Sequence, residues 1–148
     1  YNFDVVSNKI NEDNALKNLN IYKGDWGKYE YSDEFIKELY KKNDLTILPI
    51  KETFQPSGQS VALQSMSSGT PVMITRTKGF WDYQNFKHGE NIFFLKKNEI
   101  DLWVGKIESF FNEENIINGV SHLARESIVR DYELKKFCIK LEEIIINN

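Results

Sequence analysis

Short runs of apolar and β-branched residues alternate along the chain with stretches in which apolar residues recur every three or four positions. Continuous apolar runs of about four to eight residues indicate buried strands, and the longer spacing indicates amphipathic helices. Because parallel strands need a crossover connection, usually a helix, the alternation predicts an α/β fold with helices around a parallel sheet of about five strands. The predicted strands cover residues 3–7, 19–23, 45–50, 71–75 and 91–95.

Capping residues and apolar faces predict the helices. Ser32 precedes Asp33 and Glu34, an order typical of a helix start, because a hydroxyl caps backbone N–H groups and acids favour the positive end of the helix dipole. Cys138 lies on the apolar face of the last predicted helix, so we expect it in the core. The other predicted helices cover residues 33–42, 59–68, 100–112 and 114–131.

The composition predicts one globular domain over residues 1–148 and excludes several classes of function. Hydrophobic residues make up 41% and aromatic residues 14% of the chain, more than a disordered chain carries. The net charge of -3 argues against a general nucleic-acid or anionic-membrane surface, so no nucleic-acid partner is expected. No apolar run approaches the roughly 20 residues that span a bilayer.

Cysteine and histidine usage argues against metal sites and disulfides. A single cysteine cannot form a disulfide within the chain and fits a reducing compartment, which predicts a cytoplasmic protein. His88 and His122 lie far apart and away from cysteines or paired acids, so no metal site is expected. No other cofactor is expected either. The chain begins with Tyr1 and not with Met, and we therefore expect it to be part of a longer protein.

The loop after the predicted strand 45–50 is the most informative segment. Ligands of parallel sheets bind at the carboxyl ends of the strands, and this loop runs straight into a predicted helix. Helix N-termini bind anions, Gly58 would let a phosphate approach the backbone, and Ser57 and Ser60 can add hydroxyl donors. The alternative is that Ser57 or Ser60 only caps the helix and Pro56 only forms a turn. No Gly-Lys-Ser/Thr follows, which excludes a Walker phosphate loop.

Four charged residues at predicted strand ends are further candidates. Lys51, Arg76 and Lys78 could offset the charge of a bound phosphate, and Glu52 could contact a sugar hydroxyl. Each of them could equally be an ordinary solvated surface residue.

Four short segments carry a resemblance to a known family. They are QPSGQS at 55–60, LQSMS at 63–67, GTPV at 69–72 and GFWD at 79–82. With these segments, residues 45–95 resemble the carboxyl-terminal nucleotide-sugar domain of GT-B glycosyltransferases, in particular family 4 enzymes of the bacterial surface-polysaccharide type, in which Leu-Glu-Ala-Met-Ala stands in place of LQSMS. The resemblance is weaker over 19–44 and only architectural over 96–148.

The resemblance implies a fold, an activity and partners. The fold would be a Rossmann-like three-layer αβα domain that binds the donor. The enzyme would be a hexosyltransferase that moves a sugar from a nucleoside-diphosphate sugar to an acceptor, with retention and without a metal. The acceptor, a glycan or lipid-linked glycan, would bind an amino-terminal domain outside this chain, so the chain alone would be inactive. The longer protein would be cytoplasmic or peripheral at the inner membrane.

The resemblance also places donor contacts on residues of this chain. The family's ribose-binding glutamate falls on Gln64, whose amide can still bond a hydroxyl group. The glutamate that touches the donor sugar falls on Pro56, so that contact would pass to Gln55 or Gln59.

The nucleobase pocket of the family falls near Gly24 and Trp26. The Trp26 ring could stack on a base, or it could simply cover the sheet edge. The basic pair that neutralises the diphosphate in the family lies on the first strand and loop of the domain, whereas the spacing here aligns residues 3–7 with the second strand. Either the chain lacks that first strand or the strand over 3–7 is misassigned, and we favour a chain that is part of a longer two-domain enzyme.

Two other functions fit part of the sequence. A signalling receiver has five parallel strands with a Thr after the fourth and a Lys after the fifth, as Thr75 and Lys96 would provide. A receiver also needs an Asp where this chain has Pro49 and an acidic pair where it has Ser7 and Asn8, which makes this function a poor fit. A non-catalytic nucleotide-binding Rossmann-like module stays open, because neither family glutamate is present.

Overall fold

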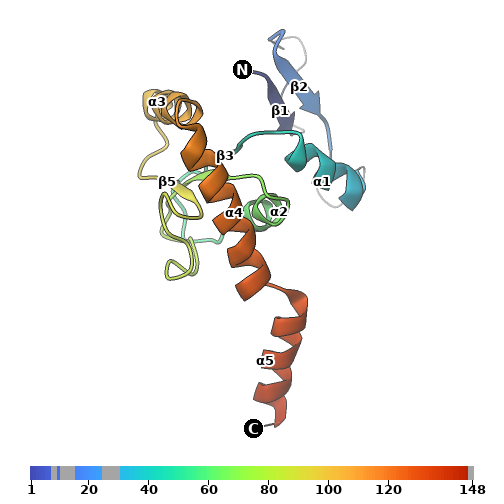
Figure 1. The fold of residues 1–148 in the computed structure, drawn as a ribbon. Helices are drawn as coiled ribbons and strands as arrows, with labels where there is room; N and C mark the ends of the chain where they lie inside the picture. Colours follow the sequence, from blue (N-terminus) through green and yellow to red (C-terminus); the bar gives the residue numbers. More distant parts are fainter. Residues whose placement is uncertain (8–9, 11–15, 25–30, 147–148) are drawn as a thin grey trace. The chain divides into compact units, whose positions relative to one another are not determined.

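The computed structural model describes residues 1–7, 10, 16–24 and 31–146, and their contacts form two compact units. The first unit covers Tyr1–Asn43 and the second Asp44–Asn148. Figure 1 shows the course of the chain through both. A single domain over 1–148 stays a prediction.

The first unit contains two parallel strands and one helix. Strand β1 (Phe3–Val6) pairs with β2 (Leu19–Tyr22), and helix α1 covers Asp33–Lys41. The Ser32 side chain accepts a hydrogen bond of 3.1 Å from the Phe35 backbone N–H, which confirms the predicted helix cap. The Lys42 ammonium lies 2.9 Å from an oxygen of the half-buried Asp4 carboxylate and ties the end of α1 to the sheet.

The second unit contains a three-stranded parallel sheet. Strands β3 (Thr46–Leu48), β4 (Val72–Thr75) and β5 (Phe93–Leu95) lie in the order β3-β4-β5. All four residues of the central strand β4 are buried, as expected of a continuous apolar run that is covered on both faces. The five described strands thus belong to sheets of two and three strands, and a single five-stranded sheet stays a prediction.

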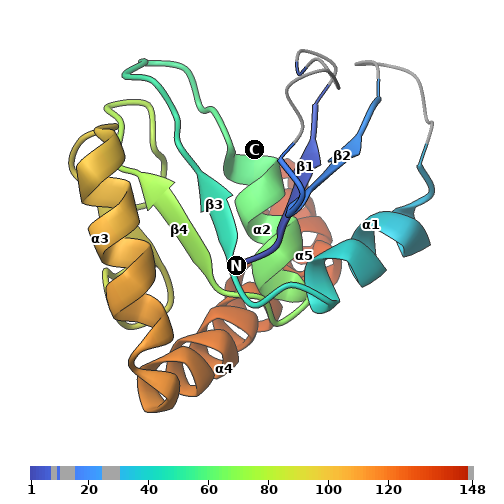
Figure 2. The ribbon, with the colours of Figure 1, turned by 90° about the horizontal axis from the view of Figure 1, so that it is seen from above.

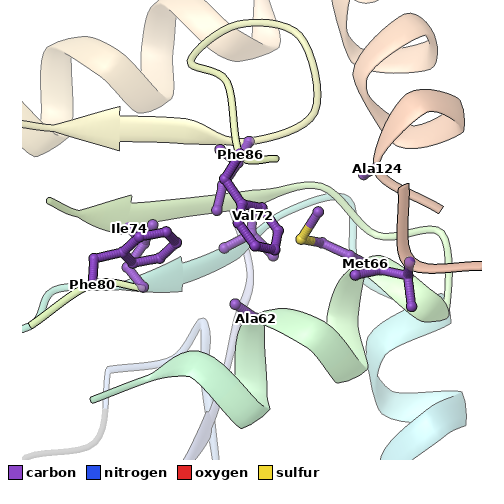
Figure 3. Close-up of a cluster of buried hydrophobic side chains, with 9 residues drawn as sticks. Ala62, Met66, Val72, Ile74, Phe80, Phe86 and Ala124 are labelled. Carbon is purple, nitrogen blue, oxygen red and sulfur yellow. The ribbon is translucent and has the colours of Figure 1, made fainter. Parts of the chain in front are cut away.

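Helices cover both faces of this sheet, as the alternation of strands and helices predicts. Helix α2 covers Gln59–Ser67, α3 covers Ile100–Phe111 and α4 covers Glu114–Asp131. Figure 2 shows α2 and α3 on opposite sides of β3 and β4. Neighbouring strand residues point to opposite faces, so β4 supplies two separate cores. The core toward α2 and α4 includes Ala62, Met66, Val72, Ile74, Phe86 and Ala124 (Figure 3), and the core toward α3 includes Met73, Leu95, Trp103 and Phe110.

The last helix, α5 (Leu134–Ile146), buries none of its residues. Figure 1 shows it continuing past the end of α4, away from the three-stranded sheet. Cys138 is exposed on it, so the prediction of a core cysteine was wrong. The apolar face of α5 was recognised correctly, but an apolar face is buried only where another element packs against it. None of the helices in the described part of the chain has the length and hydropathy that a membrane crossing requires.

A buried asparagine ties the loop before β5 to helix α4. The Asn91 side-chain amide donates 2.8 Å hydrogen bonds to the Ser127 hydroxyl and to the Asn85 carbonyl oxygen. Its side-chain oxygen accepts a 2.8 Å hydrogen bond from the Lys87 backbone N–H. Because buried polar groups are costly when unpaired, this side chain fixes the path of the loop.

Replacing Asn91 by Ala is expected to lower the free energy of unfolding by roughly 2–4 kcal/mol, because its three hydrogen-bond partners lose their contacts at a buried position. Urea denaturation followed by tryptophan fluorescence measures this change. The control Gln84→Ala alters an exposed side chain of the same loop and should stay within about 0.5 kcal/mol of the wild type. Equal stability of the two variants would contradict the role given to Asn91.

Candidate functional site

The candidate site is built around the start of helix α2, at the carboxyl ends of β3 and β4. The cap position belongs to Gly58, whose φ of +75° lies in the left-handed region that favours glycine. The Gly58 carbonyl oxygen accepts a 2.9 Å hydrogen bond from the Ala62 N–H and so begins the helix. Neither Ser57 nor Ser60 holds the cap position, so the alternative in which one of them only caps the helix is not what the structure shows.

Packing also restricts residue 58 to glycine. A Cβ atom at Gly58 would lie 3.2 Å from Ile50 Cδ1, which is closer than an ordinary van der Waals contact. It would lie 3.4 Å from Ile74 Cδ1, at the lower limit of such a contact. Ile74 belongs to β4, and Ile50 follows β3. The first turn of α2 is therefore held against the carboxyl edge of the sheet, which is where ligands of parallel sheets bind.

Three hydrogen bonds join the loop after β3, the loop after β4 and the first turn of α2. The Gly79 N–H donates to the Thr53 carbonyl oxygen at 2.8 Å, and the Lys78 N–H donates to Glu52 Oε1 at 2.9 Å. The Gln59 side-chain nitrogen donates to the Gly79 carbonyl oxygen at 3.1 Å. Glu52 and Gln59, both sequence candidates for sugar contacts, are thus engaged in holding the two loops together.

Gly79 allows the two loops to approach backbone to backbone. A Cβ atom at this position would lie 2.3 Å from the Gln55 carbonyl oxygen and 2.6 Å from the Phe54 carbonyl carbon. Real Cβ atoms essentially never come so close, so any other residue must push the loops apart. The GFWD motif identified this turn, but the sequence contains no signal that places it against Gln55.

The three basic candidates have different surroundings in the structure. The Lys78 ammonium lies over the Phe54 ring, 5.3 Å from its centre, and is therefore close to the loop that leads into α2. The Arg76 guanidinium instead lies over the Tyr83 ring at 4.5 Å from its centre. Lys51 is an exposed residue at the start of the loop between β3 and α2. Sequence reasoning missed Phe54, an aromatic residue of this loop that is 80% exposed.

Other sequence candidates lie on the helix or in the first unit. Gln64 and Ser60 are exposed and four residues apart, so they share one face of α2. Gly24 is half-buried in the first unit, and Trp26 lies outside the described residues.

Asp82 closes the turn that begins at Gly79. Its φ of +51° is unusual for a residue with a side chain, and its carboxylate accepts hydrogen bonds from the Tyr132 hydroxyl and from the Asn85 amide. Burial of the Tyr132 hydroxyl, and then its bond to Asp82, raise its pKa well above the ordinary value. The hydroxyl therefore stays protonated and holds the turn against α4.

The described residues contain no group of three or more His, Cys, Asp or Glu side chains placed to hold a metal ion. Independence of a metal stays a prediction.

Sequence comparisons find no matching family model and no matching curated protein. Similar solved structures include Anabaena HepE in complex with UDP-glucose, with a TM-score of 0.69 and 14% identity over 89% of this chain and 33% of that chain. A glycosyltransferase from Rickettsia africae has a TM-score of 0.67 and 17% identity over 86% and 31% of the two chains. Sucrose-phosphate synthase from Thermosynechococcus elongatus has a TM-score of 0.72 and 13% identity over 88% and 30%.

These likenesses show the fold: the chain shares the α/β architecture of part of GT-B glycosyltransferases, with parallel strands and flanking helices. The chain spans about a third of the length of these proteins.

Replacing Gly79 by Ala should lower the free energy of unfolding by roughly 2 kcal/mol or more, because the new Cβ would collide with the Gln55 carbonyl oxygen. Gly105→Ala is the matched control. It adds the same methyl group inside helix α3, where nothing lies within 4 Å, and should raise stability by roughly 0.5–1 kcal/mol. Thermal or urea denaturation measures both. A Gly79→Ala protein as stable as the wild type would show that the two loops are not in close contact.

Proposed function

We propose that the protein is the donor-binding part of a glycosyltransferase, which binds a nucleoside-diphosphate sugar at the start of α2. The observation that supports this proposal most is the position of Gly58, which begins a helix at the carboxyl edge of a parallel sheet and is packed against it. Backbone N–H groups of a first helical turn and the positive end of the helix dipole attract phosphate groups. The shared fold and the UDP-glucose in the HepE structure agree with such a ligand.

The donor contacts proposed here follow from the sequence and from the contacts within the site. Ser57, Gly58 and Ser60 would face the diphosphate with backbone N–H and hydroxyl groups. Gln55 is exposed, whereas the Gln59 side-chain nitrogen already donates to Gly79, so the sugar contact is assigned first to Gln55.

The nucleoside would lie farther from the sheet edge. Gln64 would bind the ribose, since it shares an exposed helix face with Ser60. That Gly24 and Trp26 contact the base is implied by the resemblance alone and stays a prediction.

The reaction would break the bond between the anomeric carbon of the sugar and the β-phosphate oxygen and would form a bond from that carbon to an acceptor hydroxyl oxygen, whose proton passes to the departing diphosphate. Negative charge then develops on the departing diphosphate, and backbone N–H groups already in place stabilise it without having to reorient. The proposal also includes retention of configuration and independence of a metal. The acceptor would be a glycan or lipid-linked glycan, bound elsewhere in a longer protein. A cytoplasmic location is also part of the proposal.

Titration with UDP, GDP and their sugars, followed by isothermal calorimetry, tests the proposal. Gly58→Ala should weaken nucleotide binding roughly tenfold, because its Cβ pushes the first turn of α2 away from Ile50 and Ile74. The control Gly69→Ala also has a positive φ, of +86°, but nothing lies within 4 Å of its Cβ position. Both variants should lose stability, by roughly 1 kcal/mol, from backbone strain.

Only Gly58→Ala should lose affinity. Failure of the wild-type protein to bind any of these nucleotides, or equal affinity of both variants and the wild type, would rule out this site.

A non-catalytic nucleotide-binding module is the second candidate, because Pro56 and Gln64 stand where the family has its glutamates. Slow hydrolysis of the donor sugar distinguishes the two candidates, since water can accept the sugar only at a competent donor site. We expect release of free sugar by the protein in its longer form. Nucleotide binding without any release would favour the non-catalytic module.

A further inference from the structure

We propose that Lys78 is the cation that neutralises the donor diphosphate, and that Phe54 is the residue that positions it. This inference rests on the proposed function. It assigns to the loop after β4 a charge that the family resembled by residues 45–95 places on its own first strand and loop.

Two contacts fix Lys78 to the loop that leads into α2. Its backbone N–H donates a 2.9 Å hydrogen bond to Glu52 Oε1, and its ammonium lies 5.3 Å from the centre of the Phe54 ring. The next residue, Gly79, donates its N–H to Thr53 at 2.8 Å. Main chain and side chain of Lys78 are thus both held beside residues 52–54, four to six positions before Gly58.

The other basic candidates lack this pair of contacts. The Arg76 guanidinium lies 4.5 Å from the centre of the Tyr83 ring and 5.8 Å from that of Phe94 on β5, and not beside residues 52–54. Lys51 is exposed and makes no aromatic contact among the described residues. Among these three candidates, Lys78 is therefore the one whose ammonium lies beside the loop between β3 and α2, where the Phe54 ring orients it.

The Phe54 ring places the Lys78 ammonium but attracts it only weakly. The ring is 80% exposed, so its attraction for the Lys78 ammonium is weak and partly screened by water. A hydrogen bond between an ammonium and a phosphate oxygen is charge-assisted and stronger. The ammonium has three N–H donors, so it can bond an arriving diphosphate while it stays over the ring.

The negative charge near this loop also favours a role for Lys78. The Glu52 carboxylate lies against the Lys78 backbone and repels an anion that approaches this loop. A nearby ammonium offsets that repulsion, and the protein as a whole has a net charge of -3, so it offers no general basic surface that could do so instead.

The first experiment compares UDP affinity of the wild type with that of Lys78→Met at several salt concentrations. We expect a roughly tenfold loss of affinity at low salt. The salt dependence of binding should also become shallower, because one screened charge contact is gone. Lys87→Met, which removes another exposed lysine of the same loop, should behave like the wild type. Thermal denaturation of Lys78→Met should match the wild type, because the backbone bond to Glu52 survives the substitution.

Unchanged UDP affinity in Lys78→Met would overturn the inference. A loss of affinity with unchanged salt dependence would overturn it as well, because Lys78 would then act on the fold of the loop and not on the phosphate charge. If the wild type binds neither UDP nor GDP, the proposed function itself fails and the inference with it, a result distinct from the other two.

A double-mutant cycle tests the part played by Phe54. Phe54→Leu should weaken UDP binding roughly threefold in the wild type and should have no effect in the Lys78→Met background, because it acts only by placing the ammonium. Equal losses in both backgrounds would show that Phe54 touches the ligand itself and would overturn its positioning role. No loss in the wild type would overturn that role too.

Discussion

The candidate site depends on the close approach of two backbone segments at the carboxyl edge of the three-stranded sheet. The Gln55 carbonyl oxygen occupies the space in which a side chain of residue 79 would begin, so the loops after β3 and β4 can approach this closely only with glycine at position 79. Hydrogen bonds from Gly79 to Thr53 and from Gln59 to Gly79 then join both loops to the first turn of α2. A helix start held in this way presents its N–H groups in a fixed direction, and fixed dipoles stabilise charge without the cost of reorientation.

The sheet supplies the base on which these loops stand. Strand β4 is buried along its whole length, and it sends alternate side chains into the two cores on either side. Because β3 and β4 are parallel, their carboxyl ends lie at one edge and both loops leave from it. Ile74 of β4 and Ile50 after β3 then fill the space below Gly58, so packing in the core continues into the geometry of the site.

Much of this fold follows from local patterns in the sequence. The apolar runs identified β3 and β4, and the Ser32 cap and the apolar spacing located helices such as α4 (Glu114–Asp131) to within a residue or two. Long-range relations were out of reach, because they depend on which elements meet. The exposure of Cys138 is an example. In the site, the glycine at 58 was recognised by its type, whereas the contact of Gly79 with Gln55 links residues 24 positions apart and leaves no local trace.

The most direct test of the central claim is amide chemical-shift mapping by nuclear magnetic resonance during titration with UDP. The account predicts that the largest shifts fall on the backbone N–H groups of residues 57–61, with smaller ones on residues 52–55 and 78–79, which are bonded to them or to each other. Shifts confined to other parts of the chain, such as α3 or α5, would contradict it. So would a spectrum that does not change at millimolar UDP.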